Sequence, residues 1–550
     1  MIIVQKLDPK QLEALNGAMS APVAMIHGPP GTGKTFLGVL LARSILATTS
    51  EQILIVCFTN HALDDLLEDF IDAGITSIVR LGGRSKNERL AEYNLIEKTK
   101  NGKAEFNREQ KRRYAAIMEQ IEKAQEDVKR LEKICSREIG AKWWRTIGPF
   151  LQDNHLPCWN QLSVEFAEES QDKDGFQVVG QGAEDHLWKL WLKGRPPSKL
   201  YKDRKEMPLW NMTKAERESQ KAIWQQEMYS DEFKELASAL SRIDRRKSEL
   251  QELRRMQDTE ILSKARIIGC TTTKAAMSKS LLDHLSPGVV LVEEAAEIME
   301  AHIITSLSSK TKHLIMIGDH KQLRPKAQNF SLTVEAGRGL DFNKSMFERL
   351  AATIPPFSLS VQHRMHPEIS AIPRLITYPD LRDAETVNDR PELRGLSTRL
   401  AFINHSVMED KQDSFQDRVE SISRTNTHEV GLVQGVVRYM LQQGYKPGDL
   451  VVLTPYLGQL LRLKDALASI CNVFVDDLDV SELRRSGEDV RFKSNVVDSD
   501  ENSPLDPVRV ATIDNYQGEE ADIVIVSLVR SNPEGNIGFL RDAEKLLLAI

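Results

Sequence analysis

The segment that most limits how this chain can fold is a short glycine-rich run between an apolar stretch and an amphipathic one. In "APVAMIHGPPGTGKTFLGVLLARSIL", Gly28, Gly33, Lys34 and Thr35 match the pattern G-x-x-x-x-G-K-[ST]. Small residues let backbone N–H groups surround phosphate oxygens at the N-terminus of a helix. Lys34 would reach the β- and γ-phosphates, and the Thr35 hydroxyl would ligate Mg²⁺. The predicted phosphate-binding residues are Gly28, Pro29, Pro30, Gly31, Thr32, Gly33, Lys34 and Thr35.

A phosphate-binding loop needs a carboxylate partner at the end of another strand, and "VVLVEEAAE" supplies two. Alone, adjacent acids after an apolar run are typical of a solvated strand end or a helix N-terminus. In a chain that also has a phosphate-binding loop, they indicate residues that take part in catalysis. Glu293 stands where the Mg²⁺ ligand belongs, and Glu294 where the catalytic base belongs. Asp is the commoner Mg²⁺ ligand at this position, and the Glu side chain is longer than that of Asp by one methylene group.

Length, charge and cysteine usage set wider limits. The 550 residues predict three or four compact units. A net charge of −7 means that any nucleic-acid surface must be a local basic groove. The cysteines form no C-x-x-C pair, which predicts no zinc site and no disulfide framework. The first residues lack a signal-type apolar core, and no apolar run approaches membrane-spanning length. We therefore expect no membrane partner and a cytoplasmic or nuclear location, or both.

Further motifs follow in a fixed order along the chain. They are "LDPKQ", "VCFTNHALDDLLE", "IVRLGGRSKNERLAEYNL", "GCTTTKAA", "GDHKQLRP", "SVQHRMHPEIS" and "TIDNYQGEEADIVIVSLVRSN". With the phosphate-binding loop and the paired glutamates, this series resembles the superfamily 1 helicases of the up-frameshift type. The closest resemblance is to the NFX-type zinc-finger helicase branch. It covers about residues 1–95 and 263–550.

The resemblance implies an α/β fold with two RecA-like parallel-sheet P-loop NTPase domains. ATP would bind between them, and a long helical, coiled-coil-like insertion would interrupt the first. The expected ranges are 1–95 for the first part of domain 1, 96–262 for the insertion, 263–345 for the second part of domain 1 and 346–550 for domain 2.

The resemblance also assigns roles to single residues. Gln11 would read the adenine edge, because its amide offers both a donor and an acceptor. Gln322 would contact the γ-phosphate or the attacking water, and Arg364 would act as an arginine finger. Gly518 and Glu520 would complete the nucleotide cleft. Relatives outside this branch mostly have Tyr where His363 stands, so stacking of this residue on adenine is left open.

The expected nucleic-acid contacts lie in loops at the ends of strands, where hydroxyl and amide groups suit phosphate and sugar. They are Thr59, Asn60, Thr271, Thr272, Thr273, Thr512 and Asp514. Without the resemblance, each Thr would be interpreted as a helix cap or a turn residue. None of them reads a base edge, so binding should tolerate any sequence and weaken with salt. The choice between RNA and DNA is not readable from these residues.

The insertion has a different pattern. Apolar residues alternate four and three apart at Ile117, Ile121, Ala124, Val128, Leu131 and Cys135. A second stripe, which predicts the other helix of an antiparallel hairpin, comprises Leu236, Leu240, Ile243, Leu250 and Leu253. Between the stripes lie six tryptophans, Trp143, Trp144, Trp159, Trp188, Trp191 and Trp210. They favour a small aromatic core over a base-stacking surface, because large aromatic side chains dominate burial.

The resemblance predicts an ATP-hydrolysing RNA helicase or translocase in RNA silencing or RNA surveillance. Its cofactors would be ATP and Mg²⁺, and its partners single-stranded RNA and RNA-silencing or RNA-decay complexes. The alternatives are a nucleotide-gated RNA clamp with weak hydrolysis and a DNA helicase of the related branch. In the family, a Thr-Arg-Ala-Arg element with a second arginine finger follows the segment that aligns with "LLLAI". The sequence as given ends before this element, so Arg364 would be its one arginine finger. We therefore expect the sequence as given to bind ATP and RNA but to hydrolyse ATP slowly.

Overall fold

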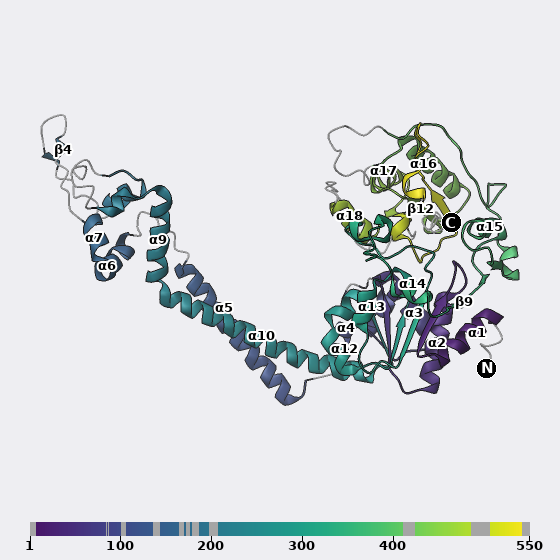
Figure 1. Ribbon diagram of the computed structural model, residues 1–550, viewed down its shortest axis with the longest axis horizontal. Helices are drawn as coiled ribbons and strands as arrows, with labels where there is room; N and C mark the ends of the chain where they lie inside the picture. The colour runs from purple at the N-terminus through teal and green to yellow at the C-terminus, as the bar shows by residue number, and fades with distance from the viewer. Residues whose placement is uncertain are drawn as a thin grey trace. The chain divides into compact units, whose positions relative to one another are not determined.

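The computed structural model describes residues 7–83, 85, 87–100, 106–135, 144–163, 170–171, 177–178, 186–196, 207–410, 424–485 and 507–541. The chain divides into two compact units. The first comprises Met1–Ala104 and Asp258–Ile550, and the second comprises Glu105–Gln257. Within the described part of the first unit there are two large parallel sheets, each accompanied by helices (Figure 1).

The first sheet has the strand order β3-β6-β2-β7-β8-β1-β9 in the described residues, and every pairing is parallel. Its strands are β1 (Val23–His27), β2 (Ile53–Cys57), β3 (Ile78–Arg80), β6 (Ile267–Thr271), β7 (Val289–Val292), β8 (His313–Gly318) and β9 (Phe357–Ser358). These segments are almost continuously apolar, as expected for a parallel sheet covered on both faces. Strands β3 and β6 pair although the second unit separates them in sequence.

Helices cover both faces of this sheet, and alternate side chains of β2 show the division. Ile53 and Ile55 join one core cluster, whereas Leu54 and Val56 join another. The first cluster takes in α1 (Pro9–Ser20), α2 (Lys34–Thr48) and α3 (Asn60–Asp72). The second takes in α4 (Leu95–Lys100), the end of α10 (Ser230–Lys264), α11 (Thr272–Met277), α12 (Lys279–Leu285), α13 (Glu300–Ser306) and α14 (Met346–Ala351).

The second sheet has the order β13-β14-β12-β15 in the described residues and is also parallel. Its strands are β12 (Leu450–Thr454), β13 (Val473–Phe474), β14 (Val508–Thr512) and β15 (Ile523–Val526). The accompanying helices are α16 (Thr427–Gln442), α17 (Leu457–Leu467) and α18 (Asp477–Arg485). Between the sheets in sequence lie β10 (Val361–Gln362), α15 (Pro367–Ile376) and β11 (Arg382–Asp383), and β10 pairs with β11.

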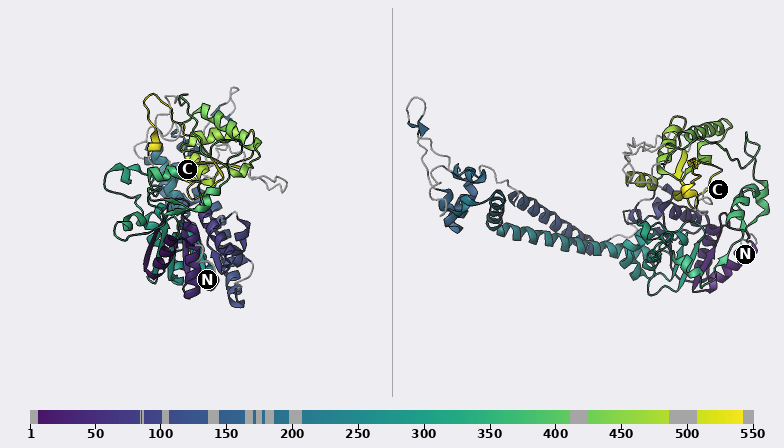
Figure 2. Two further views of the ribbon diagram at one scale, coloured as in Figure 1. Left: turned by 90° about the vertical axis from the view of Figure 1, so that its right-hand side faces the viewer. Right: turned by 45° about the horizontal axis from the view of Figure 1, so that its top comes forward.

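The second unit is built on a helical hairpin of α5 (Arg108–Cys135) and α10, which lie side by side in Figure 1 and in the right-hand view of Figure 2. Ile117, Ile121, Leu250 and Leu253 form their shared apolar cluster. The pairing is antiparallel, because Tyr114 meets Arg254 and Asp127 meets Arg242. One predicted seam position differs from expectation. Leu240 is 47% exposed, and Ala239 beside it is buried instead.

The tryptophans of this unit form a core of their own. It is made by α6 (Trp144–Asn154), α7 (Leu156–Leu162), α8 (His186–Leu192) and α9 (Lys214–Met228). Trp188, Trp191 and Trp224 are fully buried in it, and Trp144 stacks on Trp159 with ring centroids 5.2 Å apart. Trp143, named with this group in the sequence analysis, lies outside the described residues. Burial of this extent favours the aromatic core over the base-stacking surface.

The predicted α/β class with two parallel sheets and a long helical insertion is confirmed. Among the described helices, none combines the length and the apolar character that crossing a membrane requires.

Candidate nucleotide site

The loop between β1 and α2 has the conformation that its glycines allow. Gly31 and Gly33 adopt φ of +73° and +77°, in the left-handed region that disfavours residues with a Cβ atom. At Gly28 a Cβ atom would lie 2.6 Å from Lys34 Cγ, so a side chain there would collide with the lysine. The loop leads directly into α2, whose N-terminal N–H groups are suited to an anion.

Lys34 folds back over this loop. Its Nζ donates to the Gly28 carbonyl at 3.1 Å and lies 3.6 Å from Glu294 Oε1. The side chain is only 11% exposed. A cation is thus held at the centre of the loop, opposite the carboxylates that follow β7.

Glu293 is placed to share a metal ion with Thr35. The Thr35 hydroxyl donates to Glu293 Oε1 at 3.1 Å, although 258 residues separate the two in sequence. Glu293 is 3% exposed, and its Oε2 is buried with no hydrogen-bond partner among the described residues. Burial, reinforced by the charge of Glu294, raises the pKa of Glu293 to about 8. A hard divalent cation, which prefers oxygen ligands, fits this donor pair because it would satisfy the unpaired oxygen and offset the buried charge.

Glu294 has an unusual backbone. Its φ of 49° and ψ of 45° lie in the left-handed region, which costs a non-glycine residue about 1–3 kcal/mol and is concentrated at functional sites. Its side chain, 17% exposed, is directed toward Lys34 rather than Thr35. Burial and the Glu294 charge also raise the pKa of Glu297. Glu293, beside Thr35, and Glu294, beside Lys34, therefore occupy different environments.

Gln322 lies in the turn after β8. It is 5% exposed, its backbone N–H donates to the Asp319 carbonyl at 3.1 Å, and its side-chain oxygen accepts from Gln517 at 3.4 Å. Asp319 is buried and its Oδ1 lies 2.9 Å from Nε2 of His27, the residue that precedes the loop. Asp319 belongs to the motif "GDHKQLRP", but neither Asp319 nor His27 was assigned a role from the sequence. A buried acid directly after an apolar strand was the available signal.

Gln11 makes a hydrogen bond to the phosphate-binding loop from α1. It is 3% exposed, accepts from the Asp8 backbone N–H at 3.3 Å and donates to the Thr32 carbonyl at 3.2 Å. Asp8 in turn caps α1 by accepting from the Gln11 backbone at 2.9 Å. The residue predicted to read adenine is therefore next to the loop, with its amide engaged in holding the loop to α1.

Arg364 also reaches the loop. The neighbouring His363 backbone N–H donates to the Gly31 carbonyl at 2.8 Å, and a Cβ atom at Gly31 would lie 2.7 Å from Arg364 Cβ. The guanidinium pairs with Glu520 at 2.5 Å. The predicted arginine finger and the predicted cleft residue Glu520 thus lie together. Gly518, two residues earlier, has a φ of +85°.

The loop after β14 carries several contacts to the first-sheet region. Lys326 Nζ donates to Asn515 at 2.8 Å and pairs with Glu482 at 3.2 Å. His61 lies 3.5 Å from Glu519, and hydrogen bonds to Asp65 and Glu519 raise the pKa of His61 to about 10. We call residues 513–520 the bridging loop. It touches both the turn of Gln322 and the start of α3.

The predicted nucleic-acid residues gather at the carboxyl edges of the sheets. Cys57 of β2 pairs with Thr271 of β6, so the segments that follow these strands start side by side. The Thr59 hydroxyl accepts from the Ala62 backbone N–H in α3, and the Thr271 hydroxyl accepts from the Lys274 backbone N–H in α11, so both act as helix caps. The Asn60 amide oxygen accepts from the buried Arg80 at 3.0 Å, which leaves the amide N–H groups for another partner.

The remaining predicted contacts differ in exposure. Thr272 is 1% exposed, and Thr273 beside it on α11 is exposed. The Thr512 hydroxyl donates to Asp479 at 2.6 Å and is buried, whereas Asp514 lies in the turn after β14 and is half-buried. At this edge, Thr273 and Asp514 are therefore more accessible than Thr272 and Thr512.

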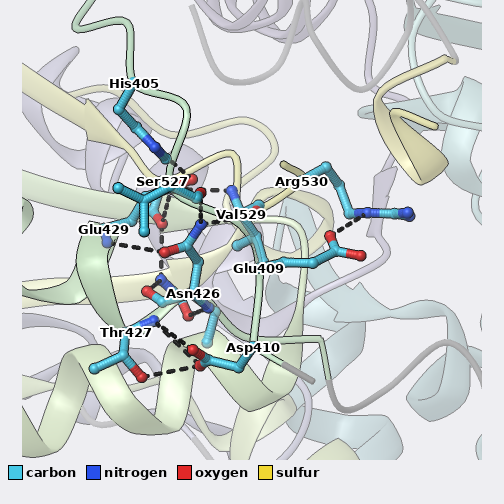
Figure 3. A network of polar contacts seen from close by, with 11 residues as sticks. His405, Glu409, Asp410, Asn426, Thr427, Glu429, Ser527, Val529 and Arg530 are labelled. Carbon is cyan, nitrogen blue, oxygen red and sulfur yellow. Dashed lines mark hydrogen bonds and ion pairs between the residues drawn. The ribbon is translucent and has the colours of Figure 1, made fainter. Parts of the chain in front are cut away.

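The loop after β15 is held by a buried polar network (Figure 3). Glu429, on the first turn of α16, accepts from the Ser527 hydroxyl at 2.7 Å and from the Val529 backbone at 2.9 Å. Asn426 donates to the Val529 carbonyl at 3.2 Å. Val529 has a φ of +70°, rare for a β-branched residue, and these contacts fix that conformation. Arg530 then pairs with Glu409 at 2.7 Å.

Fold and site together define a P-loop nucleotide-binding protein with two parallel-sheet domains. AAA domain family models match residues 6–328 and 342–550, and the chain belongs to this family as a superfamily 1 helicase of the up-frameshift type. The resemblance inferred from the motifs is thereby confirmed.

The most similar curated relatives include three that align with 99% of this chain. The human "NFX1-type zinc finger-containing protein 1" is 30% identical over 671 residues, and the aligned part is 33% of that protein. The Schizosaccharomyces pombe "Helicase required for RNAi-mediated heterochromatin assembly 1" is 26% identical, with 56% of its length aligned. The Caenorhabditis elegans "Regulator of nonsense transcripts 1" is 25% identical, with 37% aligned. The chain thus spans between a third and just over half of these relatives.

Among solved structures, T4 UvsW aligns with 98% of this chain and 65% of its own, at 9% identity and a TM-score of 0.26. A likeness this slight has no bearing on the fold.

Proposed function

We propose that this protein hydrolyses ATP between its two parallel-sheet domains and uses the energy to move along single-stranded RNA. The observation that carries the proposal is the convergence of five groups around one loop. They are Lys34, Thr35, Glu293, Glu294 and Arg364. This is the set that phosphoryl transfer to water requires, since the reaction depends mostly on positioning and charge stabilisation.

The roles follow from the contacts. Thr35 and Glu293 would hold Mg²⁺, which when bound supplies positive charge that offsets the phosphate oxygens. Lys34 lies where it can neutralise the β- and γ-phosphates. Glu294, which lies 3.6 Å from Lys34 Nζ, would accept a proton from the attacking water. Arg364 would exchange its pairing with Glu520 for the charge that develops on the transferring phosphoryl group.

RNA as the strand is supported by the relatives. The S. pombe relative is named for RNAi-mediated heterochromatin assembly and the C. elegans relative for nonsense transcripts. We place the protein in RNA silencing or RNA surveillance, with single-stranded RNA and the protein complexes of those processes as partners. Its location would be the cytoplasm, the nucleus or both.

The test is ATP hydrolysis by the purified chain with no strand, with poly(U) and with poly(dT), followed by displacement of a strand from a tailed duplex. We expect stimulation by poly(U), with Lys34→Ala abolishing turnover but not folding. Equal or greater stimulation by poly(dT) would favour the DNA-helicase alternative. Nucleotide-dependent RNA retention without strand displacement would favour the clamp. Turnover retained in Lys34→Ala would place the nucleotide elsewhere.

A further inference from the structure

The Asp319 carboxylate is the junction of three segments of the site. It is 1% exposed. Oδ1 accepts from the Lys321 backbone at 3.1 Å and lies 2.9 Å from His27 Nε2, and Oδ2 accepts from the Tyr378 hydroxyl at 2.6 Å. Burial acts to raise the pKa of Asp319, but its contacts with His27 and Tyr378 outweigh this and lower it. The group is therefore ionised, and each of its two oxygens has a hydrogen-bond partner.

Each partner leads to a different part of the candidate site. His27 precedes Gly28 of the phosphate-binding loop. Lys321 belongs to the turn that ends at Gln322. Tyr378 follows α15 and is buried, at 4% exposure, together with Leu381. Since both carboxylate oxygens are used, a shift of any one partner would disturb the other two.

Tyr378 is connected to Arg364 by a short, well-bonded route. The Leu381 backbone donates to the Tyr378 carbonyl at 3.0 Å, and β11 follows immediately. In β11, Asp383 accepts from the Gln362 side chain of β10 at 2.8 Å. The Gln362 side-chain oxygen in turn accepts the backbone N–H of Arg364 at 2.9 Å. Gln362 is fully buried, so this route has little freedom to adjust.

We propose that Tyr378 is a positioning residue. It fixes the segment that carries Arg364 (residues 361–366) relative to the phosphate-binding loop, through the Asp319 carboxylate. The inference rests on the proposed ATP hydrolysis and adds a residue that acts through Arg364 without touching the nucleotide. His27, Asp319 and His320 also place possible metal-ligand atoms within 4.8 Å of one another. Hydrogen bonds already occupy both Asp319 oxygens, so we favour the positioning role over a metal site.

The test begins with Tyr378→Phe, which removes one hydroxyl and keeps the ring. We expect kcat to fall about tenfold or more, because small displacements of catalytic groups cost up to ~10². Affinity for ATP should be unchanged, since no phosphate contact is lost. Without nucleotide, amide exchange should become faster at residues 361–366 and 378–384. Tyr439→Phe is the matched control, because Tyr439 lies on α16 and its hydroxyl likewise makes a hydrogen bond, to the Gly395 carbonyl at 2.7 Å.

A double-mutant cycle with Arg364→Ala makes the test specific. If Tyr378 acts through Arg364, Tyr378→Phe should cost little further activity in the Arg364→Ala background. Two independent, additive losses would overturn the proposal, as would wild-type kcat and amide exchange in Tyr378→Phe. One equivalent of zinc or manganese, bound by the wild type and lost in His320→Ala, would also overturn it. If the wild type hydrolyses no ATP, the proposed function fails, and the amide-exchange comparison still decides whether Tyr378 positions the loop.

Discussion

Glu293 and Glu294 are adjacent and chemically identical, but their surroundings differ. Glu293 is buried against Thr35, and one of its oxygens has no hydrogen-bond partner in the part of the chain that the structure describes, whereas Glu294 is directed toward Lys34 from a left-handed backbone. Glu294→Gln keeps the size of the side chain but cannot accept a proton. We expect it to bind ATP while kcat falls roughly 10²- to 10⁴-fold, the range typical of a lost general base. Glu293→Gln should instead raise the Mg²⁺ concentration needed for half-maximal turnover.

A magnesium titration of both variants checks this division. Identical behaviour in the titration would show that the two carboxylates have the same role.

At the scale of residues, the sequence predicted which residues lie close together but not all of their contacts. Gln11 and Arg364 could be placed beside the loop from motif order. The Gln11 amide makes hydrogen bonds to Asp8 and Thr32 as part of the capping of α1. The order of the motifs does not indicate this interaction.

The bridging loop gives a prediction at the scale of elements. His61 pairs with Asp65 and Glu519, and these hydrogen bonds raise its pKa to about 10. A histidine whose pKa is raised on folding contributes stability that is complete below its unfolded pKa of about 6.5 and is lost as pH rises through the folded value. The melting temperature of the wild type should therefore exceed that of His61→Gln at pH 6, with the gap narrowing toward pH 10. A gap that does not change with pH would show that the ion pairs contribute nothing.

The tryptophan core gives a second prediction at this scale. Trp188 is fully buried among Trp144, Trp191 and Trp224. Trp188→Ala should destabilise this core by about 3–5 kcal/mol, because it leaves a large cavity. Affinity for single-stranded RNA should stay within twofold, since a buried indole cannot stack on a base. Limited proteolysis and an RNA titration measure the two effects. A large loss of RNA affinity with an unchanged proteolysis pattern would support base stacking instead.

What the sequence could predict about elements followed from periodicity. The apolar strands, the phosphate-binding loop and the helical hairpin were each predictable from spacing. Leu240 was assigned to the seam by its spacing from Leu236 and Ile243, yet it is exposed. Ala239 occupies the buried position, because it lies four residues before the buried Ile243. The contacts of the Asp319 carboxylate with His27 and Tyr378 were not predictable, since these residues come from three distant segments and only folding brings them together.

At the scale of the whole molecule, the division into two units predicts that the insertion is separable. Residues 105–257 form their own unit, with an apolar cluster along the hairpin and a tryptophan core. On either side of it, Leu95 of α4 and Ile261 and Leu262 of α10 share one core cluster of the first unit. The two junctions of the insertion are therefore attached to the same core, and a short flexible linker can connect them.

Replacing residues 105–257 with a glycine–serine linker should leave the first unit folded. We expect its circular dichroism melt to stay cooperative and ATP binding to be retained, because Lys34, Thr35, Glu293 and Arg364 make their contacts within that unit. Strand-stimulated turnover then separates two roles for the insertion. Unchanged stimulation would mean that the hairpin serves interactions away from the ATP cycle, whereas a selective loss of strand displacement would assign it to the nucleic-acid path. Failure of the shortened chain to fold would contradict the separability that the two units predict.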